Sequence, residues 1–191
     1  MTVAIEQKKY TPQEYLDLET DGEERHDYMD GDIVLMPGGT PNHNRIALNL
    51  AGFLNFTLKR QPYDVFIADQ RLWIPQKRIY TYPDVIVVRD DIQFQEGRND
   101  TIVNPLIIVE VLSPSTRSYD KGDKFAAYRT IPGFCEYLLI EQDIPHVEHY
   151  LKTDKNQWLF SEYDGIEASF EFGSIESSID FSELYDKVRF E

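Results

Sequence analysis

Two almost uninterrupted runs of apolar residues constrain the fold of this 191-residue chain more than any other feature. Residues 85–88 read Val-Ile-Val-Val, and residues 106–112 read Leu-Ile-Ile-Val-Glu-Val-Leu. Runs without polar alternation are typical of central strands that are buried on both faces of a sheet. They predict strands at 84–88 and 106–112, in a sheet that other elements cover on both sides.

Helices and further strands are predicted around these two runs. Thr11-Pro12-Gln13-Glu14 combines a capping box with a proline at the first helical position, so a helix should run from there to about Leu18. A second helix should start at Thr40-Pro41, because apolar residues recur at helical spacing from Ile46 to Leu58. The other predicted elements are a hairpin within 27–36, a helix at about 119–129, strands at 65–68, 72–74, 137–141, 147–152, 158–163 and 168–172, and a short helix from about residue 180.

This pattern predicts a single domain, residues 1–191, of the α/β (α+β) class. The only cysteine, Cys135, lies in an apolar stretch and is expected to be a small core residue, and one cysteine excludes an intrachain disulfide. No apolar run reaches the ~18 residues that span a bilayer, and no signal peptide is recognisable. We therefore expect a cytoplasmic protein without a membrane partner.

The net charge of −15 argues against strong nonspecific binding to nucleic acid, which requires Lys and Arg to neutralise phosphates. The acidic residues are concentrated at the two ends of the chain. Residues 1–42 carry 3 basic and 10 acidic residues, and residues 136–191 carry 4 and 14. Residues 43–135 carry 12 basic and 10 acidic residues, which leaves room for a local basic groove.

Two acidic residues interrupt the two apolar runs. Asp84 opens the first run directly after Pro83, and Glu110 lies inside the second. An ionised carboxylate is costly to bury unless it is paired or bound to a metal. If the two strands are neighbours, Asp84 and Glu110 would converge on one Mg²⁺ or Mn²⁺ ion, completed by a backbone carbonyl and waters. The alternative is that Glu110 ends a strand or pairs with an arginine.

Two lysines follow the second run. Lys121, Lys124 and Tyr128 are spaced i, i+3 and i+7, so one helix face is expected to carry all three. A lysine near a metal would orient a water or offset the charge of a phosphate. Taken alone, the spacing fits equally well with a solvated helix face.

Three segments together resemble a known bacterial family, the Uma-two-type endonucleases. The segments are Tyr82-Pro83-Asp84-Val85, Val109-Glu110-Val111-Leu112-Ser113-Pro114-Ser115-Thr116, and Tyr119-Asp120-Lys121-Gly122-Asp123-Lys124 with Tyr128. The similarity extends from residue 10 to residue 137. It implies a PD-(D/E)XK, restriction-endonuclease-like fold with a mixed central sheet flanked by helices, here with an additional β-rich C-terminal part.

The resemblance implies that Asp84 and Glu110 are metal ligands, and Val111 would add its backbone carbonyl. The sequence departs from the general Glu-x-Lys pattern because Leu112 stands where lysine is expected. The resemblance suggests that the lysine has moved to the following helix, with Lys124 as the first choice and Lys121 as the second.

Three further residues are weaker candidates for the same site. Asp27 matches an acidic position before the family's hairpin and would orient a metal water, although an exposed strand acid is the commoner case. His43 would either make a polar contact in the first turn of its helix or face the substrate. Asp69, near the end of a strand, is a candidate third carboxylate. His146 and His149 are expected to be exposed, and their spacing is no zinc motif without further ligands.

These observations lead to two main hypotheses. The first is a Mg²⁺-dependent endonuclease that hydrolyses phosphodiester bonds in DNA and forms a homodimer. The second is a catalytically inactive homodimer of the nuclease fold that acts as an interaction or DNA-binding module. A two-carboxylate glycosidase would explain the acids but not the lysines that follow them.

Overall fold

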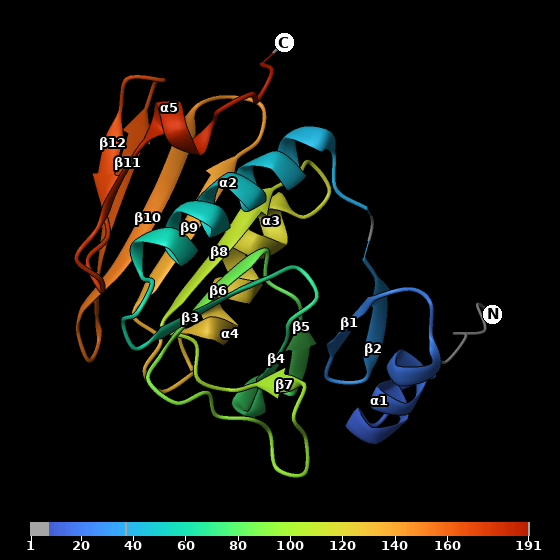
Figure 1. Cartoon of the computed structure of the whole chain (residues 1–191). Helices are drawn as coiled ribbons and strands as arrows, with labels where there is room; N and C mark the ends of the chain where they lie inside the picture. The colour runs from blue at the N-terminus through green and yellow to red at the C-terminus, as the bar shows by residue number, and fades with distance from the viewer. Residues whose placement is uncertain (1–7, 37, 191) are drawn as a thin grey trace.

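The structure is a computed structural model that describes residues 8–36 and 38–190. Its centre is a six-stranded sheet in the order β11-β10-β9-β8-β6-β3, in which β8 and β9 are parallel and the other neighbours are antiparallel (Figure 1). The strands are β3 (Tyr63–Ile67), β6 (Val85–Arg89), β8 (Ile107–Leu112), β9 (Glu136–Glu141), β10 (His146–Asp154) and β11 (Gln157–Asp164). The two apolar runs therefore form buried strands of this sheet, as predicted, and the structure shows that the two strands are neighbours.

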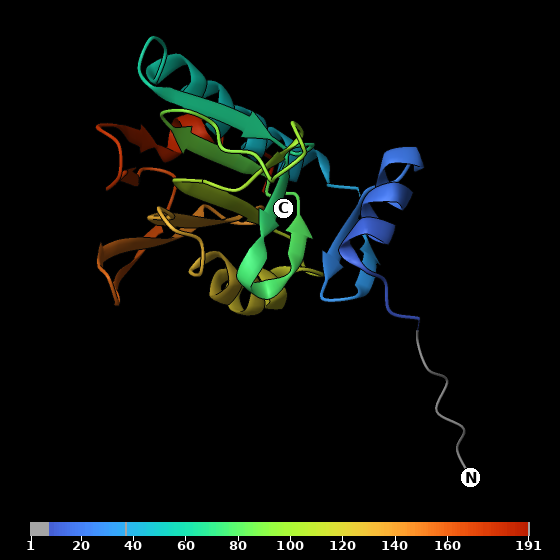
Figure 2. The same cartoon turned by 90° about the horizontal axis from the view of Figure 1, so that it is seen from below.

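Helices cover both faces of this sheet (Figure 2). On one face lies α2 (Pro41–Thr57), which Thr40 caps by accepting a hydrogen bond from the backbone N–H of His43. On the other face lies a helical segment that connects β8 to β9. It consists of α3 (Arg117–Tyr119), a π-helical turn (Asp120–Lys124) and α4 (Phe125–Tyr128). A helix between two strands is the usual connection of a parallel pair.

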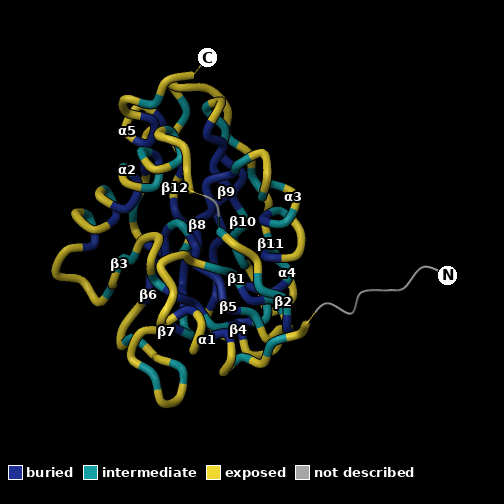
Figure 3. Tube along the Cα trace, turned by 90° about the vertical axis from the view of Figure 1, so that its right-hand side faces the viewer, coloured by how far each residue is buried: buried dark blue, intermediate teal, exposed yellow. Residues whose placement is uncertain are grey.

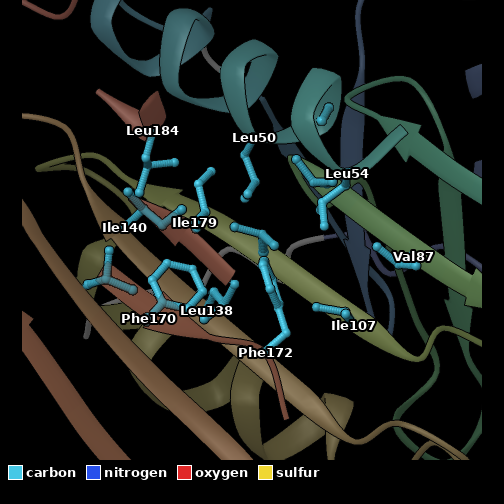
Figure 4. Packing of buried hydrophobic residues seen from close by; sticks show 14 of the residues in the cluster. Leu50, Leu54, Val87, Ile107, Leu138, Ile140, Phe170, Phe172, Ile179 and Leu184 are labelled. Atoms are coloured by element: carbon cyan, nitrogen blue, oxygen red, sulfur yellow. The ribbon is translucent and has the colours of Figure 1, made fainter. Parts of the chain in front are cut away.

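The core between α2 and the sheet contains the apolar residues whose helical spacing predicted this helix. Ile46, Leu50 and Leu54 are fully buried and face the odd-numbered residues of β6 and β8. The C-terminal elements close this side of the core; they are β12 (Ser169–Glu171), β13 (Ser178–Asp180) and α5 (Phe181–Leu184). Figure 4 shows Phe170, Ile179 and Leu184 packed against Leu138 and Ile140. The tube in Figure 3 shows β8 and β9 buried in the interior, with the exposed segments mostly in loops at the periphery.

A second sheet stands beside the central one, in the order β2-β1-β5-β4-β7. Its strands are β1 (His26–Met29), β2 (Asp32–Leu35), β4 (Arg71–Ile74), β5 (Ile79–Thr81) and β7 (Thr101–Ile102). The helix α1 (Pro12–Asp21) packs on it through a small aromatic core that contains Tyr15, Tyr28 and Tyr80. In Figure 1, α1, β1 and β2 lie to the right of the central sheet.

A buried chain of hydrogen bonds ties α1 to the strands that lead into the central sheet. The Tyr82 hydroxyl donates to Glu19 Oε1 over 2.9 Å and accepts from Arg71 Nε over 2.8 Å. Glu19 also accepts from the backbone N–H of His26. Because these groups are buried, each needs its partner, and the chain fixes where α1 and the β1–β2 hairpin lie.

Several elements differ from the prediction. The strands at 79–81, 101–102 and 178–180 were not predicted, because they are short and their residues gave no clear strand signal. The third helix starts at Arg117 instead of 119 and contains the π-helical turn. The structure also corrects the expected exposure of His149, which is buried and contacts Glu136 Oε1 through Nε2 at 2.6 Å. Cys135 is only partly buried and packs at the edge of the core.

In the residues that the structure describes, no helix has the length and apolar character needed to cross a membrane.

Candidate active site

The register of β6 and β8 brings the two sequence-selected carboxylates together. Val85 pairs with Val109, so continuing the same antiparallel register by one residue puts Asp84 opposite Glu110. Opposed residues of an antiparallel pair point to the same face of the sheet. The two acids that interrupt the two apolar runs therefore meet at one end of these strands.

Glu110 is almost completely buried and is held by two donors from the covering helical segment. Its Oε1 accepts hydrogen bonds from the Tyr128 hydroxyl at 2.6 Å and from Lys124 Nζ at 3.1 Å. Burial raises the pKa of Glu110 to about 8, with the nearby carboxylates adding to the rise and Lys124 opposing it. The alternative pairing of Glu110 with an arginine does not occur; its charged partner is Lys124.

Lys124 is buried between two carboxylates. Its Nζ lies 3.1 Å from Glu110 Oε1 and 3.0 Å from Asp120 Oδ1. Burial alone would lower the pKa of Lys124, but the charges of Glu110, Asp27 and Asp120 outweigh it and raise this pKa well above its ordinary value. The first-choice lysine thus lies next to the Glu110 carboxylate.

Lys121 does not share the helix face of Lys124 and Tyr128. Its ammonium contacts Glu148 on β10, and it lies 4.0 Å from Glu141 at the end of β9. The reason is the π-helical turn from Asp120 to Lys124, which holds an extra residue per turn and breaks the i, i+3, i+7 alignment. In place of Lys121, the residue that faces Lys124 one turn earlier is Asp120.

Asp84 accepts a hydrogen bond from the backbone N–H of Val111 at 2.7 Å, through Oδ2. The same oxygen lies 3.3 Å from Nε2 of His43, which comes from the first turn of α2. Burial would lower the pKa of His43, but hydrogen bonding to Asp84 and its negative charge, together with the Val111 backbone, raise it. His43 thus faces the two-carboxylate site from the opposite layer to Lys124.

These side chains line one pocket of about 450 Å³ between the β1–β2 hairpin and the ends of β6 and β8. Asp27 reaches it from β1, and its pKa is raised by burial. Three buried polar atoms among the described residues of the pocket lack a hydrogen-bond partner: Asp27 Oδ1, His43 Nδ1 and Tyr119 Oη. Unpartnered buried polar atoms are rare in proteins, and they are expected where a ligand or ion completes the site.

Asp69 does not join the pocket. Its side chain is 82% exposed and pairs with Arg25 at 3.3 Å, on the surface. It follows β3, two residues beyond the end of that strand, and Ala68 just before it has a positive φ of 39° that turns the chain. The geometry thus leaves Asp27, not Asp69, as the carboxylate nearest to Asp84 and Glu110 among the weaker candidates.

The pocket also contains residues that sequence reasoning missed. Gln142 is buried behind it, where its amide donates to the Leu112 carbonyl at 2.8 Å and its oxygen accepts from the Thr40 hydroxyl. Asp120 also lines the pocket, although the sequence did not single it out as a site residue. It lies four residues before Lys124, which is the spacing of an ion pair on a helix, and this spacing could have revealed it.

A second group of possible metal ligands lies outside the pocket. His146, Glu148 and Glu162 place ligand atoms within 4.8 Å of one another on β10 and β11. Glu148 is already bound by Lys121 and by the Tyr150 hydroxyl at 3.0 Å, and His146 contacts Asp164 at 2.7 Å. Ion pairs and hydrogen bonds within the protein therefore explain why these side chains lie together, without a metal ion.

The sequence of this chain matches a known protein family over most of its length. Residues 12–178 match the model of the family Uma2, which is described as "Putative restriction endonuclease". The chain belongs to the Uma2 family. The matched segment includes Asp84, Glu110, Lys124 and the three weaker candidates, so the resemblance carried by the sequence motifs is confirmed.

Two curated relatives of this Uma2 chain come from Synechocystis sp. (strain ATCC 27184 / PCC 6803 / Kazusa). The uncharacterized protein sll1609 is 40% identical over 172 residues, which cover 90% of this chain and 97% of the relative. The uncharacterized protein slr1290 is 36% identical over 157 residues, which cover 81% of this chain and 80% of the relative.

The fold of this Uma2 chain is also that of a solved nuclease-like structure. It aligns with a crystal structure from Anabaena variabilis ATCC 29413, described as "a putative nuclease belonging to DUF820", with a TM-score of 0.73. The alignment covers 92% of this chain and 97% of the other at 20% identity. The predicted fold class, a mixed sheet flanked by helices with additional C-terminal strands, is therefore confirmed.

Proposed function

We propose that this Uma2 protein is an endonuclease that hydrolyses phosphodiester bonds in DNA with the help of Mg²⁺ or Mn²⁺. The observation that carries the proposal is the meeting of Asp84, Glu110 and Lys124 in one pocket of about 450 Å³. Two carboxylates and a lysine from three separate elements have no common purpose in a structural core, where charged groups are costly. In phosphodiester cleavage, in contrast, carboxylates bind the metal ion and a lysine offsets the charge of the phosphate.

The residues of the pocket fit a divalent cation. Four carboxylates (Asp27, Asp84, Glu110, Asp120) face one buried lysine among the described residues that line it. One of these carboxylates, Asp27, carries a buried oxygen without a hydrogen-bond partner. Mg²⁺ prefers such oxygen ligands and keeps several waters, so an open, acidic pocket suits it.

In the proposed mechanism Asp84 and Glu110 would hold the cation, and the backbone carbonyl of Val111 would add a neutral oxygen. The hydrogen bond from the Val111 N–H to Asp84 fixes that carboxylate relative to β8. When bound, the cation supplies Lewis-acid stabilisation of the phosphate charge and lowers the pKa of a water. Asp27, which lines the pocket from the hairpin side, would orient a water there.

Lys124 offsets the negative charge that accumulates on the phosphate during attack. Its ammonium is held by Glu110 and Asp120, so it needs little reorganisation when the charge develops. His43 holds a proton at Nε2 near Asp84 and contacts the substrate or the leaving oxygen from the α2 side.

We also propose that the protein is a homodimer, by analogy with other proteins of this fold. Sedimentation equilibrium tests this proposal.

The first experiment is calorimetric titration of Mg²⁺ and Mn²⁺ into the wild-type protein, Asp84→Asn and Glu110→Gln. We expect binding to the wild type and a loss of at least about 10-fold in affinity in each variant, because each removes a charged ligand. Asp69→Asn is the matched control, since this exposed aspartate lies outside the pocket and its variant should bind like the wild type.

The same proteins are then assayed for cleavage of labelled DNA. Cleavage that disappears in Asp84→Asn and Glu110→Gln but survives in Asp69→Asn supports the proposal. Activity that survives both pocket variants contradicts it. Metal binding without cleavage of any nucleic acid would instead favour an inactive nuclease fold that serves as a binding module, which the net charge of −15 also favours.

A further inference from the structure

The pocket has two walls of different chemistry. The wall formed by β6, β8 and the helical segment carries the charged residues described above. The facing wall comes from the β1–β2 hairpin and the segment after it, and it is apolar: Met29, Val34, Leu35 and Met36. In the hairpin, Asp27 is the cross-strand partner of Val34, so the charged and apolar parts of the pocket adjoin there.

The side chains of the apolar wall are partly exposed to solvent. Val34 is 45% exposed and Leu35 is 51% exposed, on the edge strand of the second sheet. Tyr82 and Tyr119 also line the pocket. Flat apolar and aromatic surfaces of this kind receive unstacked bases in proteins that act on unpaired nucleotides.

The size of the pocket agrees with one nucleotide. A volume of about 450 Å³ lies within the ~300–1,000 Å³ of pockets that bury small organic ligands. Beside the apolar wall, the hydroxyls of Ser113 and Ser115 line the rim and offer hydrogen-bonding groups to a base or sugar. A base against the hairpin would leave its phosphate facing Glu110 and Lys124.

The charges around the pocket disfavour a continuous duplex. Double-stranded DNA carries one negative charge per ~1.7 Å of its axis, and proteins bind it with many Lys and Arg contacts. Besides Lys124, the helical segment carries two cations, and both are engaged outside the pocket, Arg117 with Glu141 and Lys121 with Glu148. The lining itself holds more carboxylates than cations in the part of the chain that the structure describes.

We propose that the substrate of this site is DNA with an unpaired nucleotide at the cleaved position, whose base lies against the apolar wall formed by Val34, Leu35 and their neighbours. The proposal rests on the proposed nuclease function and adds the substrate class to it. One nucleotide brings one phosphate to the site, a charge that Lys124 and the cation suffice to balance. Continuous duplex would bring a row of phosphates against an acidic surface.

The test compares one DNA sequence in three forms, with Mn²⁺: a single strand, a blunt duplex, and a duplex with an unpaired bulge. We expect the single strand and the bulge to be cleaved with a kcat/KM at least about five-fold above that of the blunt duplex, given the usual contribution of one stacked base. Equal or faster cleavage of the blunt duplex would overturn the inference and leave the nuclease function intact.

A double variant tests the wall itself. Val34→Ser with Leu35→Ser should raise the KM for the single strand by at least about five-fold and leave Mn²⁺ affinity unchanged. The matched control is Leu159→Ser with Phe160→Ser, an adjacent apolar pair of similar exposure, 53% and 46%, on the edge strand β11. An unchanged KM in the Val34 and Leu35 variant would refute the wall as the base site.

Binding measurements separate this inference from the nuclease proposal. If the wild type cleaves no DNA form, the nuclease function fails, and fluorescence anisotropy with a labelled thymidylate oligomer then decides the inference. Tighter binding of the single strand than of the duplex, weakened by the Val34 and Leu35 variant alone, supports the base site. Equal binding of both forms contradicts it.

Discussion

At the scale of single residues, the environment of Lys124 is what separates it from the other lysines. Its ammonium is enclosed by Glu110 and Asp120, and the surrounding carboxylates keep its pKa well above the ordinary value. The neighbouring carboxylates therefore favour its charged form. The side chain of Lys121, three residues earlier, is 33% exposed and is bound to Glu148 on β10.

These two lysines give a matched pair of variants. Lys124→Met should lower kcat by about 10²–10³-fold, because it removes a fixed positive charge from the transition state. Lys121→Met should leave kcat close to that of the wild type. The measurement is single-turnover cleavage at saturating Mn²⁺, with circular dichroism to show that both variants are folded. Equal losses in the two variants would mean that Lys124 acts through stability and not through chemistry.

At the scale of elements, the connection between β12 and β13 depends on a close approach of two chain segments. A methyl group at Gly173 would lie 2.2 Å from Leu151 Cδ2 on β10. The N–H of Gly173 donates to the buried Glu136 carboxylate at 2.9 Å, and Ser174 donates to the same group. These bonds and that from His149 lower the pKa of Glu136 although burial opposes this, and they hold the C-terminal strands on the core.

Two glycine variants should therefore have opposite effects on stability. Gly173→Ala should lower the free energy of unfolding by about 1–3 kcal/mol, because the methyl group forces Leu151 or the loop to move. Gly52→Ala, inside α2 with no atom within 4 Å of the added methyl, should raise it by about 0.5–1 kcal/mol. Urea denaturation measures both. Destabilisation by both variants, or by neither, would contradict the packing described.

At the scale of the whole molecule, a net charge of −15 has to be reconciled with a negatively charged substrate. In the central segment, Arg71, Arg98, Arg117 and Lys121 are paired with acidic residues, so these four cations are already engaged within the protein. The proposed solution is local: one phosphate enters an acidic pocket whose cation and lysine provide the counter-charge. Long-range attraction then contributes little to binding.

This picture predicts a weak dependence of binding on salt. With about one or two phosphate contacts, the logarithm of the binding constant for single-stranded DNA should fall with a slope between about −0.7 and −1.4 against the logarithm of the salt concentration. Anisotropy titrations of a labelled single strand over a range of KCl at fixed Mn²⁺ give this slope. A slope steeper than about −4 would indicate an extended basic surface and contradict the single-phosphate geometry.

Some features follow from the sequence alone. The apolar runs at 85–88 and 106–112 are long enough to specify buried strands, and the stripe of α2 specifies the face that packs on them. Carboxylates inside such strands stand out because burying a charge is costly, so Asp84 and Glu110 could be selected without a structure. Local periodicity and local chemistry suffice for these conclusions.

Other features depend on contacts between distant segments and could be decided only by the tertiary structure. The antiparallel pairing of β6 with β8 puts Asp84 opposite Glu110, and the π-helical turn selects Lys124 over Lys121. The burial of Asp27 and the exposure of Asp69 depend on where the hairpin and β3 come to lie. Side-chain direction in three dimensions is set by packing of the whole chain, which spacing along the sequence does not encode.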